Sequence, residues 1–376
     1  MQQYDLAVVG GGIMGLAHAL HGAQAGLSVA VFERGGQADG ASVRNFGMLA
    51  IVAQRPGAEL DSARRTLAHW QRFGAEAGIN ARQAGCLFVA RTPQEMAVMQ
   101  ECAANADQHG QSFVPIARDD LAGYAEGLRT DTALGGLWSE DAWKLDQRSA
   151  MARLSVWLQR VHGVTFLMGC EVRGIAGGVL DTTEGAVRAA QTVICGGSEF
   201  ARLFPADFAA TGVTTCQLQM LRTAPQPGEY RLSPFVLGGL SLPRYTAFAD
   251  CPSLPDLRAT LAQSRGREIA NGIHLIAAQE ADGSITIGDS HHYGADAPRE
   301  RLDEVDQLMM AETSALLALP DARIAQRWLG HYAHLPGQAS LVLHPAPGVT
   351  AVTMTNGQGM THGLAKAEDV IAQLFG

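Results

Sequence analysis

Apolar and polar positions along the chain follow the periods of strands and helices in turn. Residues 6–9 form a short, uniformly apolar run that predicts a buried strand, and a glycine-rich turn follows at once. Residues 13–25 carry an Ala/Leu-rich helical pattern that Gly26 ends, and a second apolar run covers residues 28–32. This order predicts a β-α-β unit at the start of the chain.

The rest of the chain is less regular. We expect helices at residues 58–78, 93–109, 146–161, 298–318 and 359–374, and strands at residues 85–91, 192–195, 213–223, 273–290 and 349–353. Asp146 is of the residue type that caps a helix, and Pro320 stops the long amphipathic helix before it. A short helix is expected after Gly196-Gly197.

The turn after the first strand has the spacing of a dinucleotide-binding motif. Gly10-Gly11-Gly12-Ile13-Met14-Gly15 fits G-x-G-x-x-G, and Glu33 ends the next strand. Gly10 would permit the tight turn, Gly12 would let the backbone approach a diphosphate, and Gly15 would let helix and strand pack closely. The N–H groups of Ile13 and Met14 and the helix dipole would favour the diphosphate, while Glu33 would bind the ribose. The alternative is a structural glycine turn with an incidental glutamate.

The composition excludes some classes of binding partner and cellular location. The 376 residues carry a formal charge of -9, which argues against nucleic acid or an anionic membrane as a partner, because both need a basic face. The six cysteines are scattered without metal-ligand spacing, which indicates reduced thiols in the cytoplasm. The first strand begins so early that we expect no signal peptide, and no run is apolar enough for a membrane span.

Four segments resemble the D-amino-acid-oxidase-like (glycine/sarcosine oxidase) family of FAD enzymes. They are residues 40–48 (GASVRNFGM), 170–172, 192–198 and 355–361 (TNGQGMT), and they occur in the family's order. The resemblance implies that the first segment runs along the flavin, the second and third contact FAD through their backbone, and the fourth opens the last helix under the flavin pyrimidine. The further cofactor residues expected are Arg34, Ser42, Arg44, Asn45, Phe46, Gly47, Met48, Val172, Gly196, Gly197, Gly357, Gly359, Met360 and Thr361.

The fold implied is α/β, with a Rossmann-type FAD-binding domain and an inserted α+β substrate domain built on an antiparallel sheet. We expect the FAD-binding domain at residues 1–80, 145–205 and 325–376, and the substrate domain at residues 81–144 and 206–324. Sarcosine oxidase attaches its flavin through a late cysteine, and no cysteine follows Cys251 here, so we expect non-covalent FAD. A helix N-terminus at residues 359–361 would stabilise the negative charge of a reduced flavin, although a helix merely docked through glycines is the alternative.

The run Ser-Val-Arg-Asn-Phe-Gly-Met resembles a narrower branch associated with breakdown of 2-aminoethylphosphonate and its N-alkyl derivatives. The implied reaction is oxidation of the amine to phosphonoacetaldehyde, with oxygen as the electron acceptor and no metal. An anionic substrate would be held by arginine with help from histidine or tyrosine. The substrate-contact candidates are Arg44, His292, His331 and Tyr332, with His291, Tyr293, Arg327, Trp328 and His334 nearby in sequence. Adjacent strand residues point opposite ways, so one of His291 and His292 at most should face the site.

Other functions remain open at this point. The same fold could oxidise glycine, sarcosine or a D-amino acid, because an α-carboxylate also favours an arginine. A dehydrogenase would pass its electrons to a quinone or carrier in place of oxygen. A non-catalytic flavin-binding redox sensor would hold a flavin that no amine reduces. Each substrate candidate also has a structural alternative, since Arg44 could brace the cofactor and the histidines could be satisfied structural residues.

Overall fold

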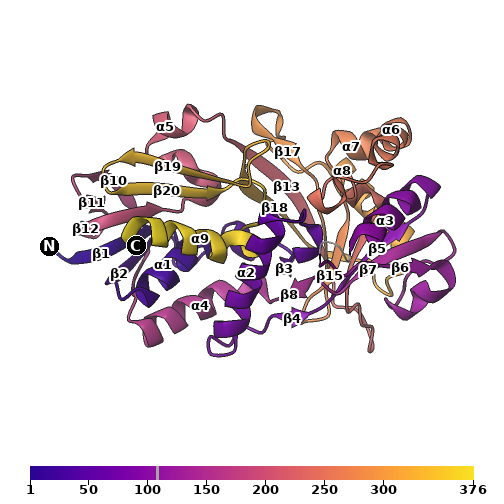
Figure 1. Ribbon diagram of the computed structural model, residues 1–376, viewed down its shortest axis with the longest axis horizontal. Coiled ribbons are helices and arrows are strands. Elements are labelled where there is room, and N and C mark those ends of the chain that lie inside the picture. Colours follow the sequence, from indigo (N-terminus) through magenta and orange to yellow (C-terminus); the bar gives the residue numbers. More distant parts are fainter. Residues whose placement is uncertain (107–109) are drawn as a thin grey trace.

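The computed structural model describes residues 1–106 and 110–376, which form two lobes around two large sheets (Figure 1). The first sheet holds β1 (Gln3–Val9), β2 (Val29–Glu33), β9 (Thr165–Met168), β10 (Val172–Ala176), β11 (Val179–Thr182), β12 (Gly185–Ile194), β19 (Ser340–Ala346) and β20 (Val349–Met354). Its core is parallel, in the order β9-β2-β1-β12-β20, and β10, β11 and β19 are antiparallel additions. Both chain termini lie in this lobe (Figure 1).

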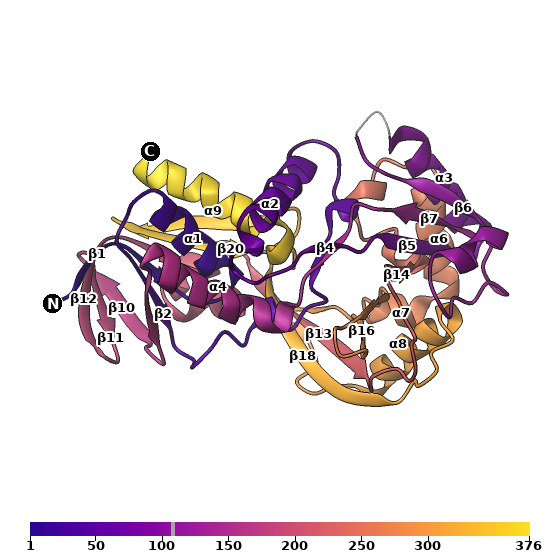
Figure 2. The same cartoon turned by 90° about the horizontal axis from the view of Figure 1, so that it is seen from below.

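Helices cover the parallel sheet because each carries an apolar face toward it. They are α1 (Ile13–Gln24), α4 (Gln147–His162) and α9 (Gly359–Phe375), with α2 (Ala58–Gly74) packed on α9. Figure 2 shows α1, α2, α4 and α9 together on this lobe. The opposite face of the sheet carries a smaller core that includes Phe32, Phe200 and Phe208, next to α5 (Pro205–Ala209).

The second sheet has nine strands, and one pair among those described, β5 with β14, is parallel. The strands are β5 (Cys86–Ala90), β6 (Val114–Ala117), β7 (Gly135–Ser139), β13 (Thr214–Thr223), β14 (Phe235–Gly238), β15 (Ile276–Gln279), β16 (Ile285–Gly288), β17 (His292–Tyr293) and β18 (Ile324–His334). The helices of this lobe are α3 (Pro93–Ala106), α6 (Leu254–Ser264), α7 (Gly266–Ala270) and α8 (Asp303–Leu316). A small sheet of β3 (Met48–Leu49), β4 (Arg82–Gln83) and β8 (Trp143–Lys144) lies between the lobes (Figure 1).

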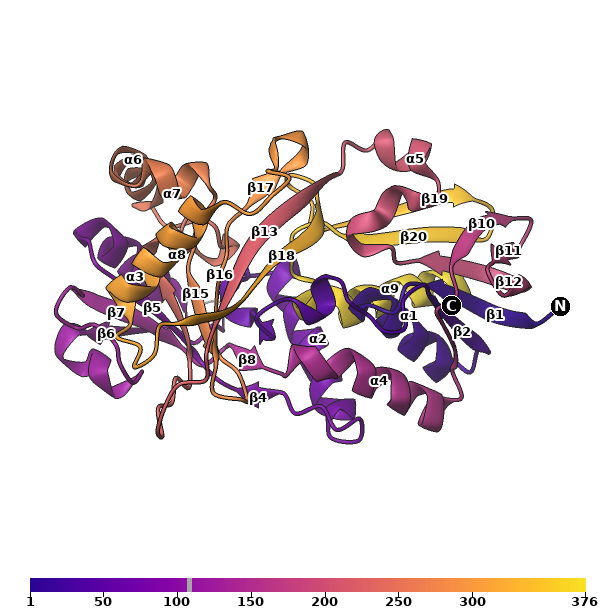
Figure 3. The ribbon, with the colours of Figure 1, turned by 180° about the vertical axis from the view of Figure 1, so that it is seen from behind.

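The two long strands β13 and β18 run toward the first lobe as an antiparallel ribbon (Figure 3). The expected domain boundary at residue 325 falls at the start of β18, which pairs with β13 of the second sheet over residues 324–334. The ribbon therefore brings residues expected in the cofactor domain alongside the second sheet.

The α/β prediction is confirmed, and two element predictions need correction. Residues 273–290 form two strands instead of one, because a turn at residues 280–283 folds β16 back onto β15. The helix expected from residue 298 begins at Asp303, since Pro298 and the residues after it form the irregular entry to α8. The expected helix 93–109 is α3, and its last three residues lie outside the described residues.

Among the residues that the structure describes, no helix is both long enough and apolar enough to cross a membrane.

Candidate active site

The glycine turn after β1 has the geometry that the motif requires. Gly10 has a φ of +110°, and a β-carbon there would overlap the carbonyl oxygen of Cys195. A β-carbon on Gly15 would overlap the carbonyl oxygen of Gly10, so this glycine permits the close approach of α1 to the turn. A β-carbon on Gly12 would meet only the Ser42 hydroxyl oxygen, at 3.1 Å. Gly12 is therefore the position with room for a ligand.

Glu33 and Arg34 have protein partners in this structure. The Glu33 carboxylate accepts hydrogen bonds from the backbone N–H groups of Gly11 and Gly35, each at 2.8 Å. Arg34 forms a surface ion pair with Glu199. The structure therefore holds Glu33 against the glycine turn and Arg34 on the surface beside it. Neither residue lines the cavity described next.

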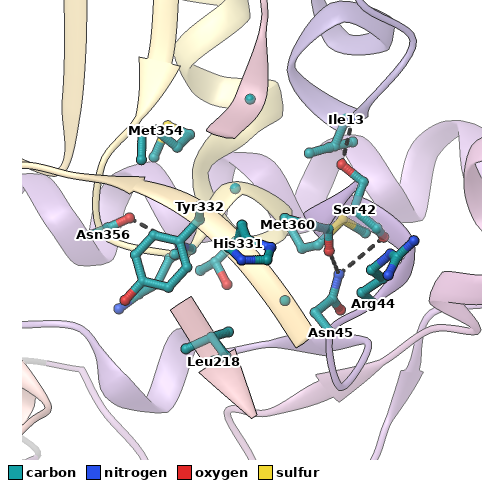
Figure 4. Close-up of a pocket in the computed structure, with 18 of the residues that line it drawn as sticks. Ile13, Ser42, Arg44, Asn45, Leu218, His331, Tyr332, Met354, Asn356 and Met360 are labelled. Carbon is teal, nitrogen blue, oxygen red and sulfur yellow. Dashed lines mark hydrogen bonds between the residues drawn. The ribbon is translucent and has the colours of Figure 1, made fainter. Parts of the chain in front are cut away.

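A cavity lies where the two lobes meet, and segments far apart in sequence line it. The lining residues expected from sequence are Gly12, Ile13, Met14, Ser42, Arg44, Asn45, Phe46, Met48, Gly197, His331, Tyr332, Gly357, Gly359, Met360 and Thr361. Figure 4 shows Ser42 bonded to the start of α1, with His331 and Tyr332 on β18 across from it. Of the other expected residues, Gly10, Gly15, Gly47, Val172 and Gly196 lie outside this lining.

Two helix N-termini open on the cavity. Among the described residues, neither N-cap, Gly12 of α1 or Gln358 of α9, accepts a capping hydrogen bond from a backbone N–H of its helix through a side chain, and neither first turn holds an acidic residue. The Ile13 N–H donates to the Ser42 hydroxyl at 2.9 Å, and the Thr361 hydroxyl accepts from the Ala50 N–H at 3.0 Å. Partial positive charge from both helices therefore meets at one cavity, which suits an anionic diphosphate and a second electron-rich group.

Of the adjacent residues His291 and His292, the structure places His291 at the cavity. The His292 ring bonds the Asn271 side chain at 3.1 Å (Nε2 to Oδ1) and does not line the cavity. Its neighbour His291 lines the cavity and is buried. The expected contact residue His292 therefore lies outside the cavity lining, whereas His291, which directly precedes β17, belongs to it.

Arg44 lies at the edge of the cavity. Its side chain is exposed and donates to the Asp39 carbonyl, while its own carbonyl accepts from the Trp328 ring N–H at 3.1 Å. Arg44 also lines a neighbouring groove together with Arg148, Arg222 and Arg327.

His331 donates through Nε2 to the Gln217 side-chain oxygen at 3.2 Å, and burial lowers its pKa.

Arg244 is the cavity cation that the sequence analysis missed. It follows the 3-10 turn Gly239–Ser241, and its guanidinium donates to the Tyr293 hydroxyl at 3.2 Å and the Tyr332 hydroxyl at 3.3 Å. Arg244 is exposed to solvent at the cavity, yet the protein atoms around it disfavour its charge; Tyr332, Tyr293 and Asp289 nearby offset this and raise the pKa of Arg244 overall. A single arginine in an irregular segment carries no periodicity or motif, so nothing in the sequence marked it.

Asp289 lies near this cation between two buried histidines. Its carboxylate is 3.0 Å from His274 Nε2 and 3.6 Å from His291 Nε2, and all three side chains line the cavity. Burial lowers the pKa of His274, and it lowers the pKa of His291 well below the usual value. Burial alone would raise the pKa of Asp289, but His291, His274 and Arg244 lower it overall, which keeps the carboxylate ionised.

The sequence of this chain is similar to that of known oxidoreductases. A family model described as "FAD dependent oxidoreductase" matches residues 5–374. Gamma-glutamylputrescine oxidoreductase of Escherichia coli (strain K12) is 23% identical over 348 residues, which cover 87% of this chain and 73% of that protein.

Solved structures share the fold over the whole chain. Glycine oxidase from Geobacillus kaustophilus matches with a TM-score of 0.78 at 19% identity, covering 100% of this chain and 95% of that one. L-proline dehydrogenase from P. horikoshii matches with a TM-score of 0.77 at 18% identity, covering 100% and 94%.

Proposed function

The chain belongs to the FAD dependent oxidoreductase family, whose model spans residues 5–374, and on that premise we propose that it oxidises a small amine bearing an anionic group. The first candidates are 2-aminoethylphosphonate and its N-methyl derivative, which would yield phosphonoacetaldehyde and ammonia or methylamine. Oxygen is the proposed electron acceptor. All six cysteines are free and buried, which suits a reducing compartment, so we place the proposed activity in the cytoplasm.

The residues around the cavity fit FAD. The N-terminus of α1 at Gly12 would hold the diphosphate, the segment from Ser42 to Met48 would lie along the ring system, and Gly357 to Thr361 would meet its electron-rich edge. When bound, the cofactor supplies an acceptor for the hydride that leaves the carbon next to the amine nitrogen. The protein supplies binding, orientation and electrostatics.

The observation that carries the substrate proposal is the cation at the cavity. The Tyr293 and Tyr332 hydroxyl oxygens each accept from Arg244, so each hydroxyl hydrogen is left to donate elsewhere. Of these residues Arg244 and Tyr332 line the cavity, so an anionic group bound there would meet a guanidinium and the Tyr332 hydroxyl together. A phosphonate has three oxygens for these donors and a carboxylate has two.

A carboxylate substrate is the second candidate. The structural neighbours include a glycine oxidase and an L-proline dehydrogenase, both named for amino acids. The Arg244 cluster would accept an α-carboxylate by the same hydrogen bonds, so the identity of the anion distinguishes the two candidates.

Steady-state kinetics on matched substrates would test the proposal. We expect kcat/KM to rank 2-aminoethylphosphonate and its N-methyl form above glycine, sarcosine and D-alanine, with ethylamine far below. Arg244→Gln should lower kcat/KM for the anionic amines about 100-fold, because a charge-assisted hydrogen bond contributes roughly 1.5–3 kcal/mol. Ethylamine should be unaffected by the change.

Arg160→Gln is the matched control, since Arg160 is an exposed residue on α4 away from the cavity. An equal loss for ethylamine and the phosphonates in Arg244→Gln would remove the anion-binding role. A preference for amino acids would keep the role and replace the phosphonate.

A further inference from the structure

Oxidation of an amine at neutral pH requires a proton to leave first. Aliphatic amines of the lysine type have pKa values of about 10.4, so they arrive as ammonium ions. An ammonium nitrogen has no lone pair to stabilise the positive charge that develops as the adjacent carbon loses hydride. The cavity therefore needs a group that accepts this proton.

The His291 ring is held in one tautomer. Its Nδ1 lies 2.9 Å from the carbonyl oxygen of Gly272, and a carbonyl can only accept a hydrogen bond, so Nδ1 carries the hydrogen. The backbone N–H of His291 also donates to the Asn271 carbonyl at 3.0 Å, which fixes the residue from both ends. In the neutral ring Nε2 is therefore unprotonated, and Asp289 lies near it.

Asp289 is placed to stabilise a proton on that nitrogen. One carboxylate oxygen lies 3.6 Å from His291 Nε2, and the other lies 3.0 Å from His274 Nε2. His274 is held in turn by Ser241, whose hydroxyl oxygen is 3.4 Å from Nδ1. An imidazolium at His291 would thus form beside a buried, ionised carboxylate with a fixed position.

The other charged and titratable groups facing His291 come from several segments. The His274 ring stacks on it at 5.2 Å between centroids, and the rings of Tyr293 and Tyr332 lie at 6.2 and 6.4 Å. Burial, Arg244 and His274 lower the pKa of His291, whereas Asp289 raises it. The balance leaves the ring neutral at pH 7, and therefore able to act as a base.

We propose that His291 is the proton acceptor of this cavity, a catalytic residue, and that Asp289 and His274 are positioning residues for it. The inference rests on the proposed function, because the proton comes from the substrate ammonium group. The N–H bond of the ammonium breaks, its electron pair stays on the substrate nitrogen, and the proton forms the new Nε2–H bond. The imidazolium then pairs with Asp289 until the proton passes to solvent.

Rapid anaerobic mixing of the holoenzyme with saturating 2-aminoethylphosphonate, from about pH 4 to 10 so that the acid limb set by His291 falls inside the range, would test this. In His291→Gln we expect flavin reduction to slow about 100-fold at pH 7, in the range found for removal of a general base. The rate should rise toward the wild-type value as pH approaches the pKa of the amine, because the free base then arrives already deprotonated. In Asp289→Asn the acid limb of the rate profile should move to lower pH, since the imidazolium loses its counter-charge.

Two controls separate a chemical role from a structural one. His344→Gln changes an exposed histidine on β19 and should keep the wild-type profile. Binding of ethylphosphonate, which has no amine, should be unchanged in His291→Gln if the pocket is intact.

The outcomes are distinguishable. A wild-type profile in His291→Gln, or the same fractional loss at every pH, would overturn the assignment of the base. If His291→Gln does not retain flavin, an unmoved acid limb in Asp289→Asn overturns it. A wild-type flavin that no amine reduces at any pH would instead remove the proposed function itself.

Discussion

At the scale of single residues, the glycine turn separates cofactor binding from packing. Gly15 is required by the fold, because a β-carbon there would overlap the Gly10 carbonyl oxygen. A β-carbon on Gly12 would meet only the flexible Ser42 hydroxyl, so the fold tolerates a side chain at this position. The same side chain would block the close approach of the cofactor diphosphate to the backbone.

This contrast predicts different failures for two similar substitutions. Gly12→Val should give a folded protein, with the thermal transition of the flavin-free wild type, that purifies without yellow colour. Gly15→Val should lose the cooperative transition itself. Circular dichroism and flavin absorbance of the purified variants would check both. Gly123→Val is the control, since its β-carbon meets open space and should leave colour and folding intact.

A Gly12→Val protein that retains stoichiometric flavin would contradict the role given to the turn.

The glycine spacing itself was predictable from sequence, because each glycine meets a local requirement of the backbone. Arg244 was not predictable, because only tertiary folding brings its segment to Tyr293 and Tyr332. Which of His291 and His292 lines the cavity was not predictable either, because His291 is held by tertiary hydrogen bonds to Gly272 and Asn271 at the entry to β17.

At the scale of elements, a buried polar network supports the segment that leads into β3. Lys144 of β8 donates to the Phe46 carbonyl at 2.8 Å and lies 3.2 Å from the Glu280 carboxylate, with both side chains at most 8% exposed. Gln147 of α4 donates to the Asn45 carbonyl at 2.7 Å and to Glu280 at 3.3 Å. Burial lowers the pKa of Lys144, so its charge depends on Glu280.

Removing one member of the Lys144–Glu280 pair should therefore lower the free energy of unfolding more than removing both members. Glu280→Gln leaves a buried ammonium without its counter-charge and should lower the free energy of unfolding by about 3–5 kcal/mol. The pair Lys144→Met with Glu280→Leu should lose less than Glu280→Gln alone. Urea denaturation of the holoproteins would measure both changes.

The exposed pair Arg267–Glu304, with side chains 68% and 51% exposed, provides the control. Glu304→Gln should change the free energy of unfolding by less than about 1 kcal/mol. Equal losses in Glu304→Gln and Glu280→Gln would show that the buried pair has no special role.

Element prediction succeeded where a local signal existed. The Asp146 carboxylate accepts from the Arg148 N–H at 3.2 Å and starts α4 as expected. The turn between β15 and β16 went unrecognised, although Ala281-Asp282-Gly283 carries turn residues, because the apolar runs on both sides read as one strand.

At the scale of the whole molecule, the cavity exists because the two lobes meet along the β13–β18 ribbon. The parallel sheet brings the N-termini of α1 and α9 to the cavity, and segments that connect strands of the second sheet bring Arg244, Asp289 and His291 to it as well. Sequence predicted the α/β class and an inserted second lobe. It did not predict the β13–β18 register, since such pairing joins residues about a hundred positions apart.

We propose above all that this flavoprotein oxidises an amine held by its anionic group. An anaerobic titration of the purified holoprotein, followed by flavin absorbance, tests it most directly. We expect 2-aminoethylphosphonate and its N-methyl form to bleach the oxidised flavin, and sarcosine, glycine and D-alanine to bleach it weakly. A flavin that remains oxidised with every amine and amino acid would contradict the claim and favour a non-catalytic redox sensor.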